Sequence, residues 1–180
     1  MRLIHLLPFA ALGLLSAALP PRSPADEVAR AKALLKNFVG TWDCEATFMG
    51  MPPSKGVETS KLLSHGLCVV SEYRSPMMPG QDFEGHGILG YDPGEAKWIH
   101  IWADNTDPSI SMSEGAWNEE GTVFTVEDTI DFGTGPMTML MVTTLQADGT
   151  RSFVMNRKDA AATDAPMARM TYRKRAEAAK

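Results

Sequence analysis

The sequence predicts a mainly β fold: an antiparallel up-and-down β-barrel of about ten strands preceded by one α-helix. After residue 40, short runs with alternating apolar and polar side chains are separated by turns rich in Gly, Pro, Asn and Asp, as in sandwiches and barrels. No helical segment of crossover length lies between these runs, which excludes parallel βαβ units. Closure into a barrel removes the unpaired edges of such a meander. An open two-sheet sandwich is the alternative.

Residues 1–19 predict a cleaved secretory signal peptide. Arg2 provides a positive start, residues 6–15 form an apolar run too short to span a bilayer as a helix, and small residues precede a cleavage point near Ala18. An uncleaved membrane anchor is the alternative. We therefore expect a periplasmic or secreted protein with no stable membrane insertion after cleavage.

The rest of the chain predicts a single domain. Residues 20–25 form a Pro-rich linker, and apolar residues recur at helical spacing from Asp26 to Phe38, where Gly40 ends the pattern. The barrel domain covers residues 26–175, and residues 176–180 are expected to form a disordered tail. A chain of 180 residues is long enough for one domain with a substantial core.

The expected strands follow in order along the domain. Two of them lie within 83–104, where Asp92-Pro93-Gly94 has the residue types of a tight turn. Gly85 and Gly87 favour a β-bulge that bends the barrel; the alternative is that they let a ligand or a strand approach the backbone. The remaining strands are expected at residues 41–49, 57–63, 67–75, 110–117, 122–130, 137–145, 151–157 and 167–174.

Composition and motifs exclude several classes of function. A net charge of −5 gives no reason to expect a nucleic-acid partner, which would require a basic surface. Residues 85–90 match a dinucleotide-binding glycine pattern letter by letter, but no helix follows them. No nucleophile motif or metal-ligand spacing occurs, so we predict no catalytic residue, metal or cofactor.

Cys44 and Cys68 are the two cysteines of the chain. An oxidising compartment would permit a disulfide between them. Each also lies in an apolar strand-like segment, where a free cysteine packs as a small hydrophobe. Both alternatives stay open, because geometry decides between them.

The strongest indication of a site is the strand that ends at Asp104. Side chains alternate between the two faces of a strand, so Trp98, His100, Trp102 and Asp104 share one face. Aromatic surface with a few polar groups is typical of a small-ligand pocket, and we predict that this face lines the barrel lumen. Alternatively, the Trp side chains pack against the helix, His100 is hydrogen-bonded within the sheet and Asp104 caps the next loop.

Two other strands contribute candidates. Glu114 shares a face with Ile110 and Met112; in the lumen its pKa would rise, whereas on the outer face it would be solvated. Tyr73 and Arg74 point to opposite faces, and we favour Tyr73 for the lumen because a buried guanidinium needs a partner. The predicted ligand-binding residues are Trp42, Tyr73, Trp98, His100, Trp102, Asp104 and Glu114.

Several motifs of the chain resemble those of a known family. Gly40-Thr41-Trp42 is similar to the Gly-x-Trp opening of calycin-type (lipocalin-like) barrels, in which the Trp closes one end. Across Leu34–Arg173 the chain resembles the bacterial domain-of-unknown-function family DUF1579. The motifs are Phe83-Glu84-Gly85-x-Gly87, Leu89-Gly90-Tyr91-Asp92, Trp98, Trp102, Asp104, Glu114-Gly115 and Met170-x-Tyr172.

This resemblance implies a calycin-like barrel, usually exported or surface-associated, with no established activity and no defined catalytic residues. The haem-binding nitrobindin type of such barrels relies on a His in its late strands. This chain has no His after His100, which argues against haem.

Three hypotheses of function follow. The first is an exported barrel that binds a small apolar ligand. The second is an enzyme that uses His100 with Asp104 or Glu114 as an acid/base pair. The third is an envelope protein-interaction module with a filled interior and an exposed apolar patch, for example at Met77-Met78.

Overall fold

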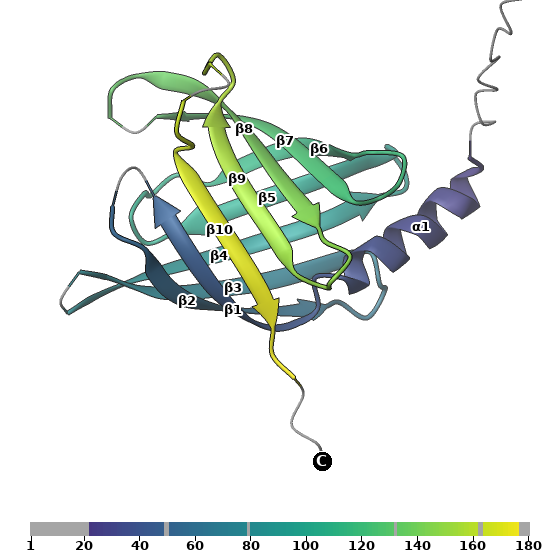
Figure 1. Ribbon diagram of the computed structural model, residues 1–180. Coiled ribbons are helices and arrows are strands. Elements are labelled where there is room, and N and C mark those ends of the chain that lie inside the picture. The colour runs from purple at the N-terminus through teal and green to yellow at the C-terminus, as the bar shows by residue number, and fades with distance from the viewer. Residues whose placement is uncertain (1–21, 49–50, 79, 132, 162–163, 177–180) are drawn as a thin grey trace, which may run out of the picture.

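The computed structural model is a closed antiparallel barrel of ten strands with one helix on its N-terminal side (Figure 1). It describes residues 22–48, 51–78, 80–131, 133–161 and 164–176. The helix α1 spans Pro24–Lys36; the strands are β1 (Gly40–Phe48), β2 (Ser54–Leu62), β3 (Cys68–Met78), β4 (Gln81–Asp92), β5 (Lys97–Asp104), β6 (Ser111–Trp117), β7 (Val123–Asp131), β8 (Pro136–Leu145), β9 (Arg151–Arg157) and β10 (Ala168–Lys174).

Each strand pairs with its neighbours in the chain, and β1 closes the barrel by pairing with β10. The predicted up-and-down barrel is therefore confirmed, and the open sandwich is excluded. The predicted signal peptide and residues 177–180 of the predicted tail lie outside the described residues. Within those residues, no helix is long and apolar enough to cross a membrane.

Helix α1 begins two residues before its predicted start, inside the predicted linker. Ser23 is the N-cap: its Oγ accepts a hydrogen bond from the backbone N–H of Asp26 at 3.2 Å, and a proline occupies the first turn. Proline suits this position because the first helical N–H groups have no partner inside the helix. The cap at Ser23, not the first acidic residue, sets the boundary.

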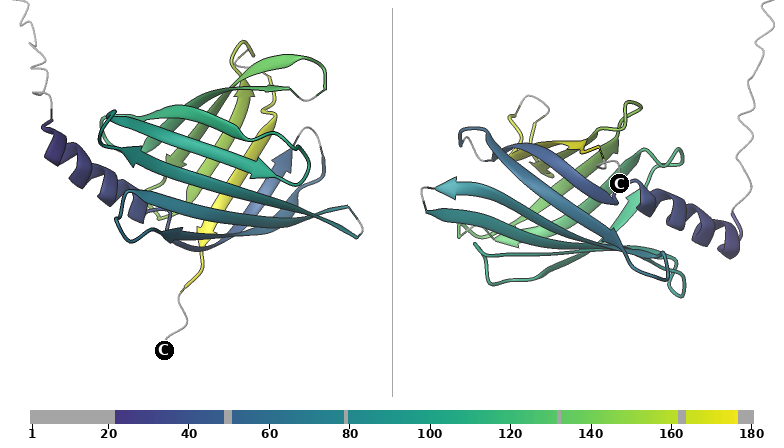
Figure 2. Two further views of the ribbon diagram at one scale, coloured as in Figure 1. Left: turned by 180° about the vertical axis from the view of Figure 1, so that it is seen from behind. Right: turned by 90° about the horizontal axis from the view of Figure 1, so that it is seen from below.

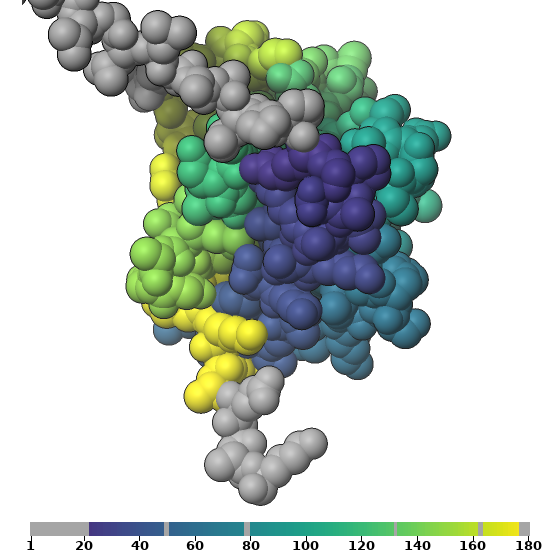
Figure 3. All heavy atoms as spheres, turned by 90° about the vertical axis from the view of Figure 1, so that its right-hand side faces the viewer, coloured from purple at the N-terminus to yellow at the C-terminus, as the bar shows by residue number. Residues whose placement is uncertain are grey.

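Helix α1 lies over one end of the barrel, which we call the helix end (Figures 1 and 3). Arg30 Nη2 donates a 2.7 Å hydrogen bond to the carbonyl of Asn118 in the β6–β7 turn. Leu34 packs so closely on Gly121 of the same turn that a Cβ there would lie 2.8 Å from it. The opposite end, which carries the loops after β3, β5, β7 and β9, is called the far end; Figure 2 gives two further views of this arrangement.

The core extends from under the helix into the barrel. Ala31 and Leu35 of α1 are fully buried, and Met139, Met141 and Met155 pack in the same cluster. Methionine is unbranched and adaptable, so it fills irregular interior space well. The methionines of β8 and β9 therefore serve as core filler.

A buried ion pair crosses the interior near the helix end. Arg151 Nη2 of β9 lies 2.6 Å from Glu58 Oε1 of β2, and the two side chains are only 4% and 10% exposed. Ser60 Oγ donates a 2.9 Å hydrogen bond to the same carboxylate oxygen. Since β10 and β1 lie between β9 and β2, this pair connects strands that share no backbone hydrogen bonds.

Aromatic rings surround the guanidinium of this pair. The Cζ atom of Arg151 lies 4.9 Å from the ring centroids of Phe38 and Trp42 and 4.0 Å from that of Tyr172. Trp42 Nε1 also donates a 2.8 Å hydrogen bond to the carbonyl of Phe38, just after the helix. Trp42 thus closes the helix end, in keeping with the Gly-x-Trp resemblance.

Cys44 and Cys68 are free thiols. Cys44 pairs with Gly56 of β2, whose next residue, Val57, pairs with Arg74 of β3. Cys44 therefore lies level with the part of β3 near Arg74. Cys68 is six residues from Arg74 on the same strand, which corresponds to about 20 Å at about 3.3 Å per residue. A disulfide requires Cα atoms within about 7 Å, so the disulfide alternative is wrong.

We expect both thiols to persist in protein purified without reductant. Alkylation in denaturant should add two groups per chain, as counted by intact mass spectrometry. In the folded protein Cys44 should react far more slowly than Cys68, because burial raises the pKa of the Cys44 thiol to about 12 and only the thiolate reacts. Alkylation that required prior reduction would contradict this register.

Replacing Arg151 by Met should lower the free energy of unfolding by about 3–5 kcal/mol, because Glu58 would remain buried without a partner. The double variant Glu58→Leu/Arg151→Met should recover most of the loss. Urea unfolding monitored by circular dichroism measures both. The control is Arg175→Met, since Arg175 pairs with Asp43 on the exposed surface; equal effects of Arg151→Met and the control would contradict the burial of Glu58 with Arg151 as its partner.

Candidate functional site

Strand β5 turns the predicted face toward the barrel interior. The Cα partners of Trp98, His100 and Trp102 on the neighbouring strands are themselves inward-facing: Tyr91, Leu89 and Gly87 on β4, and Gly115, Ser113 and Ser111 on β6. The structure thus brings these three side chains into the lumen, but they do not share one environment.

Trp98 belongs to the aromatic core at the helix end. Its ring centroid lies 5.3 Å from that of Tyr91, 5.9 Å from that of Trp117 and 6.0 Å from that of Phe124. These distances are typical of packed aromatic pairs. Trp98, like Trp42, therefore contributes to the closed end of the barrel.

Trp102 lies further along β5, toward the far end. Its indole crosses β4 over two glycines: a Cβ on Gly85 would overlap the ring, and one on Gly87 would lie 3.3 Å from it. Strand β4 pairs without a register shift through both positions, so the predicted bulge is wrong. The glycines instead admit an aromatic ring close to the backbone, and Phe83 stacks on this ring with the centroids 6.5 Å apart.

Tyr73 completes an aromatic wall with Phe83 and Trp102. The Tyr73 and Phe83 rings are 5.9 Å apart, edge to face. Burial raises the pKa of Tyr73, so its phenol stays neutral at physiological pH. Arg74, the next residue, points outward, as expected from the alternation.

Asp104 holds this wall in position. Its Oδ2 accepts a 2.9 Å hydrogen bond from Trp102 Nε1, and its Oδ1 accepts hydrogen bonds from the backbone N–H and hydroxyl of Thr106 at 2.8 and 2.6 Å. Both carboxylate oxygens are thus engaged within the protein. Asp104 caps the loop after β5, which is the alternative reading of this residue, and it orients the indole.

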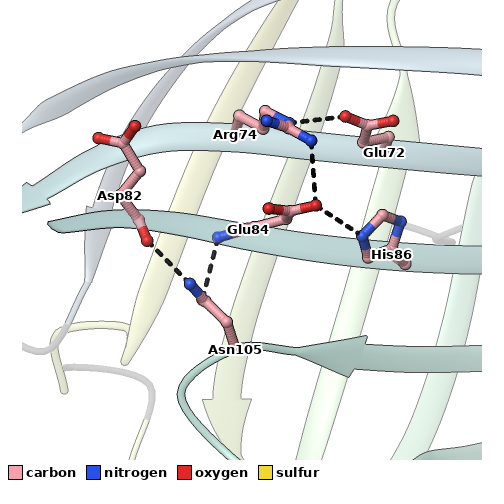
Figure 4. A network of polar contacts seen from close by, with 6 residues as sticks. All are labelled: Glu72, Arg74, Asp82, Glu84, His86 and Asn105. Carbon is pink, nitrogen blue, oxygen red and sulfur yellow. Dashed lines mark hydrogen bonds and ion pairs between the residues drawn. The ribbon is translucent and has the colours of Figure 1, made fainter.

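The same loop is fastened to β4 by Asn105, as Figure 4 shows. Asn105 Nδ2 donates to the carbonyl of Asp82 at 2.9 Å, and Asn105 Oδ1 accepts from the backbone N–H of Glu84 at 3.0 Å. The end of β5 that carries Trp102 and Asp104 is therefore fixed on both sides.

Figure 4 also shows the charged network on the outer face of β3 and β4. Arg74 lies 2.6 Å from Glu72 and 3.0 Å from Glu84, and His86 Nε2 lies 3.1 Å from Glu84. A shallow hollow of roughly 250 Å³ borders it. These side chains are solvated and bonded to one another, so they form a stabilising surface network of modest strength.

Three buried side-chain polar atoms have no hydrogen-bond partner among the described residues: Trp117 Nε1 in the aromatic core at the helix end, and His100 Nδ1 and Ser113 Oγ further along the lumen. His100 and Ser113 are direct cross-strand partners, and Ser113 is only 7% exposed. Burial lowers the pKa of His100, so its ring is neutral at pH 7. An unsatisfied buried polar group costs about 1–3 kcal/mol, so this cross-strand pair is a candidate to bind the polar group of a ligand.

A carboxylate lies on the next strand, beside this pair. Asp128 of β7 accepts a hydrogen bond from Ser111 Oγ of β6 and another from the backbone N–H of Thr129 at 2.8 Å. Its negative charge partly opposes the effect of burial on the pKa of His100. We call His100, Ser111, Ser113 and Asp128 the lumen polar cluster.

Sequence reasoning missed three members of this cluster. Asp128 alternates with Phe124, Val126 and Ile130, so a carboxylate on an otherwise apolar strand face was a signal that could have found it. The two serines carry no comparable signal, because serine occurs on both faces of strands.

Glu114 lies on the outer face. Its side chain is 62% exposed and lies 2.6 Å from Lys97 Nζ, and its Cα partner Ile99 faces outward as well. The expectation that Glu114 lines the lumen is therefore corrected to the solvated alternative. With Asp104 engaged by Trp102 and Thr106, the structure forms neither of the two predicted acid/base pairs with His100.

The outer face of β3–β6 also carries an apolar row. Cross-strand pairing aligns one residue from each of the four strands, and exposure reaches 72% at Met112. We call these residues the outer row: Val70, Ile88, Ile101 and Met112. Any test for an apolar ligand must distinguish the lumen from this row.

No three His, Cys, Asp or Glu side chains in the described ranges come together in an arrangement that could hold a metal ion.

Comparison with known proteins gives a family match. Residues 27–174 match the family described as "Protein of unknown function (DUF1579)". Among solved structures, the chain is similar to a redesigned β-barrel, with 17% sequence identity and a TM-score of 0.44, over 82% of this chain and 96% of that chain. No curated protein matches the chain.

The buried His100 should make the fold sensitive to acid. Its folded-state pKa lies below the ordinary value of 6.5, so below that pH the unfolded chain binds a proton that the folded chain does not. Stability should therefore fall as the pH drops below about 6.5, by at most about 1.4 kcal/mol per pH unit from this one group.

His100→Asn should flatten this part of the pH profile, measured by urea unfolding between pH 7 and pH 5. The control is His86→Asn, because His86 lies on the exposed outer face. Parallel profiles for the wild type and His100→Asn would contradict the assignment.

Proposed function

The chain belongs to the DUF1579 family of proteins of unknown function, and we propose from the geometry of its barrel that it is an exported protein that binds a small, mainly apolar molecule in the lumen. The observation that carries this proposal is the buried, unpartnered pair His100 Nδ1 and Ser113 Oγ, which lies next to an aromatic wall. Apolar surface with a few unsatisfied polar groups is the composition of a ligand site.

The wall supplies the apolar contact. Trp102, Phe83 and Tyr73 present a continuous aromatic surface from three adjacent strands, and Asp104 holds the indole in place. Aromatic rings fixed in this way bury a large area on binding at little cost in side-chain entropy.

The lumen polar cluster supplies orientation. A ligand that reaches His100 and Ser113 gains hydrogen bonds that no described residue provides, so its polar end would lie there and its apolar part along the wall. Trp42 and Trp98 would not contact the ligand directly, because they close the helix end beneath the site.

Export is the other part of the proposal. It is supported by the sequence of residues 1–19, with its positive start, short apolar run and small residues near Ala18. A binding barrel outside the cytoplasm would meet apolar molecules of the envelope or the surroundings.

Binding can be tested with the neutral fluorescent probe N-phenyl-1-naphthylamine, whose emission rises in apolar sites. We expect saturable binding to the wild type and a roughly tenfold weaker affinity for Trp102→Leu, since a central aromatic anchor contributes strongly to binding. Native mass spectrometry of protein from its own host should show a bound small molecule.

Ile101→Thr is the matched control, because Ile101 is adjacent on β5 but belongs to the outer row. It should leave the affinity for the probe unchanged. Loss of binding in Ile101→Thr but not in Trp102→Leu would place the probe outside the barrel and overturn the proposal. The absence of both probe binding and a native ligand would do the same.

A further inference from the structure

The charges inside the barrel do not balance. The Glu58 carboxylate is paired with Arg151, and Asp104 at the far end accepts hydrogen bonds from neutral donors. The Asp128 carboxylate also receives only neutral donors, the hydroxyl of Ser111 and the N–H of Thr129. No Lys or Arg ion pair of Asp128 is found among the described residues.

The nearby basic side chains are engaged elsewhere. Arg157 of β9, the strand paired with β8, forms an ion pair with Asp159 at 2.7 Å. Lys158 forms an ion pair with Glu127 on the outer surface at 2.6 Å. His100 is neutral because it is buried. The lumen polar cluster therefore carries a net negative charge.

The hydrogen-bonding groups of the cluster also favour a positively charged ligand group. A carboxylate such as that of Asp128 only accepts, a serine oxygen such as that of Ser113 accepts as well as donates, and one nitrogen of the neutral His100 ring accepts. Three acceptors from the adjacent strands β5, β6 and β7 suit a group with several N–H donors. The indole of Trp102 lies over Gly85 and Gly87 of β4, on the side of β5 away from β6 and β7, so it would contact the apolar part of a ligand rather than its polar end.

From these observations we infer that the ligand is an apolar molecule with a basic nitrogen at its polar end, held by Asp128, Ser113 and His100 with the apolar part along Phe83 and Trp102. This inference rests on the proposed function. A carboxylate in the same place would be repelled by the carboxylate of Asp128, so long-chain acids are disfavoured ligands.

The test compares three ligands with the same twelve-carbon chain: dodecylamine, dodecanol and dodecanoate. Each displaces N-phenyl-1-naphthylamine from the barrel at pH 7, below its micelle concentration. The amine should displace the probe at about tenfold lower concentration than the alcohol, and the acid should be the weakest. Equal displacement by amine and alcohol, or tightest binding of the acid, would overturn the inference.

Asp128→Asn should remove the preference for the amine over the alcohol. The matched control is Glu127→Gln, since Glu127 is the adjacent residue but lies on the outer face; it should keep the preference. If Asp128→Asn does not fold, Ser113→Ala serves instead and should reduce the affinity for the amine severalfold. An unchanged preference in the folded variant would refute the role of the cluster.

The two proposals fail in different ways. If the probe does not bind, or none of the three ligands displaces it, binding in the lumen itself is refuted. If the alcohol displaces the probe and the amine does no better, the barrel binds apolar molecules but the inferred basic nitrogen is wrong.

Discussion

The ion pair between Arg151 and Glu58 is the constraint on which the interior depends. Two opposite charges can be removed from water only if they lie together and their remaining hydrogen-bond donors and acceptors are satisfied. Here Ser60 donates a hydrogen bond to the carboxylate, and three aromatic rings surround the guanidinium. That arrangement requires a dry, closed helix end, which α1 and Trp42 provide. The aromatic wall and the lumen polar cluster lie beyond this closed end, toward the far end.

Much of the fold could be predicted from alternation and turns. The ten strands and the helix are where the sequence indicates, apart from shifts of a few residues at their ends, such as the start of α1 at Pro24. The face shared by Trp98, His100 and Trp102 was also predictable, because alternation along one strand needs no knowledge of its neighbours. The same reasoning separated Tyr73 from Arg74.

The parts that escaped prediction depend on register between strands. Glu114 and Asp128 each alternate with apolar residues, and only the pairing of β6 with its neighbours shows that Glu114 faces water. The distance between Cys44 and Cys68 follows from two successive registers. The role of Gly85 depends on Trp102 of the next strand, and the partner of Arg151 lies 93 residues away. Neither contact produces a periodic pattern in the sequence that could have predicted it.

The closure of the barrel joins the two ends of the domain, since Trp42 pairs with Lys174 and Phe48 with Ala168. Contacts of such long sequence separation form slowly, because the loss of chain entropy precedes the gain in hydrogen bonds. Each strand from β2 to β10 can pair with the strand that precedes it in the chain, whereas β1 completes its pairing only when β10 is available. Until then its free edge, and that of β9, can recruit other chains, so the interval before closure is when this protein is most exposed to aggregation.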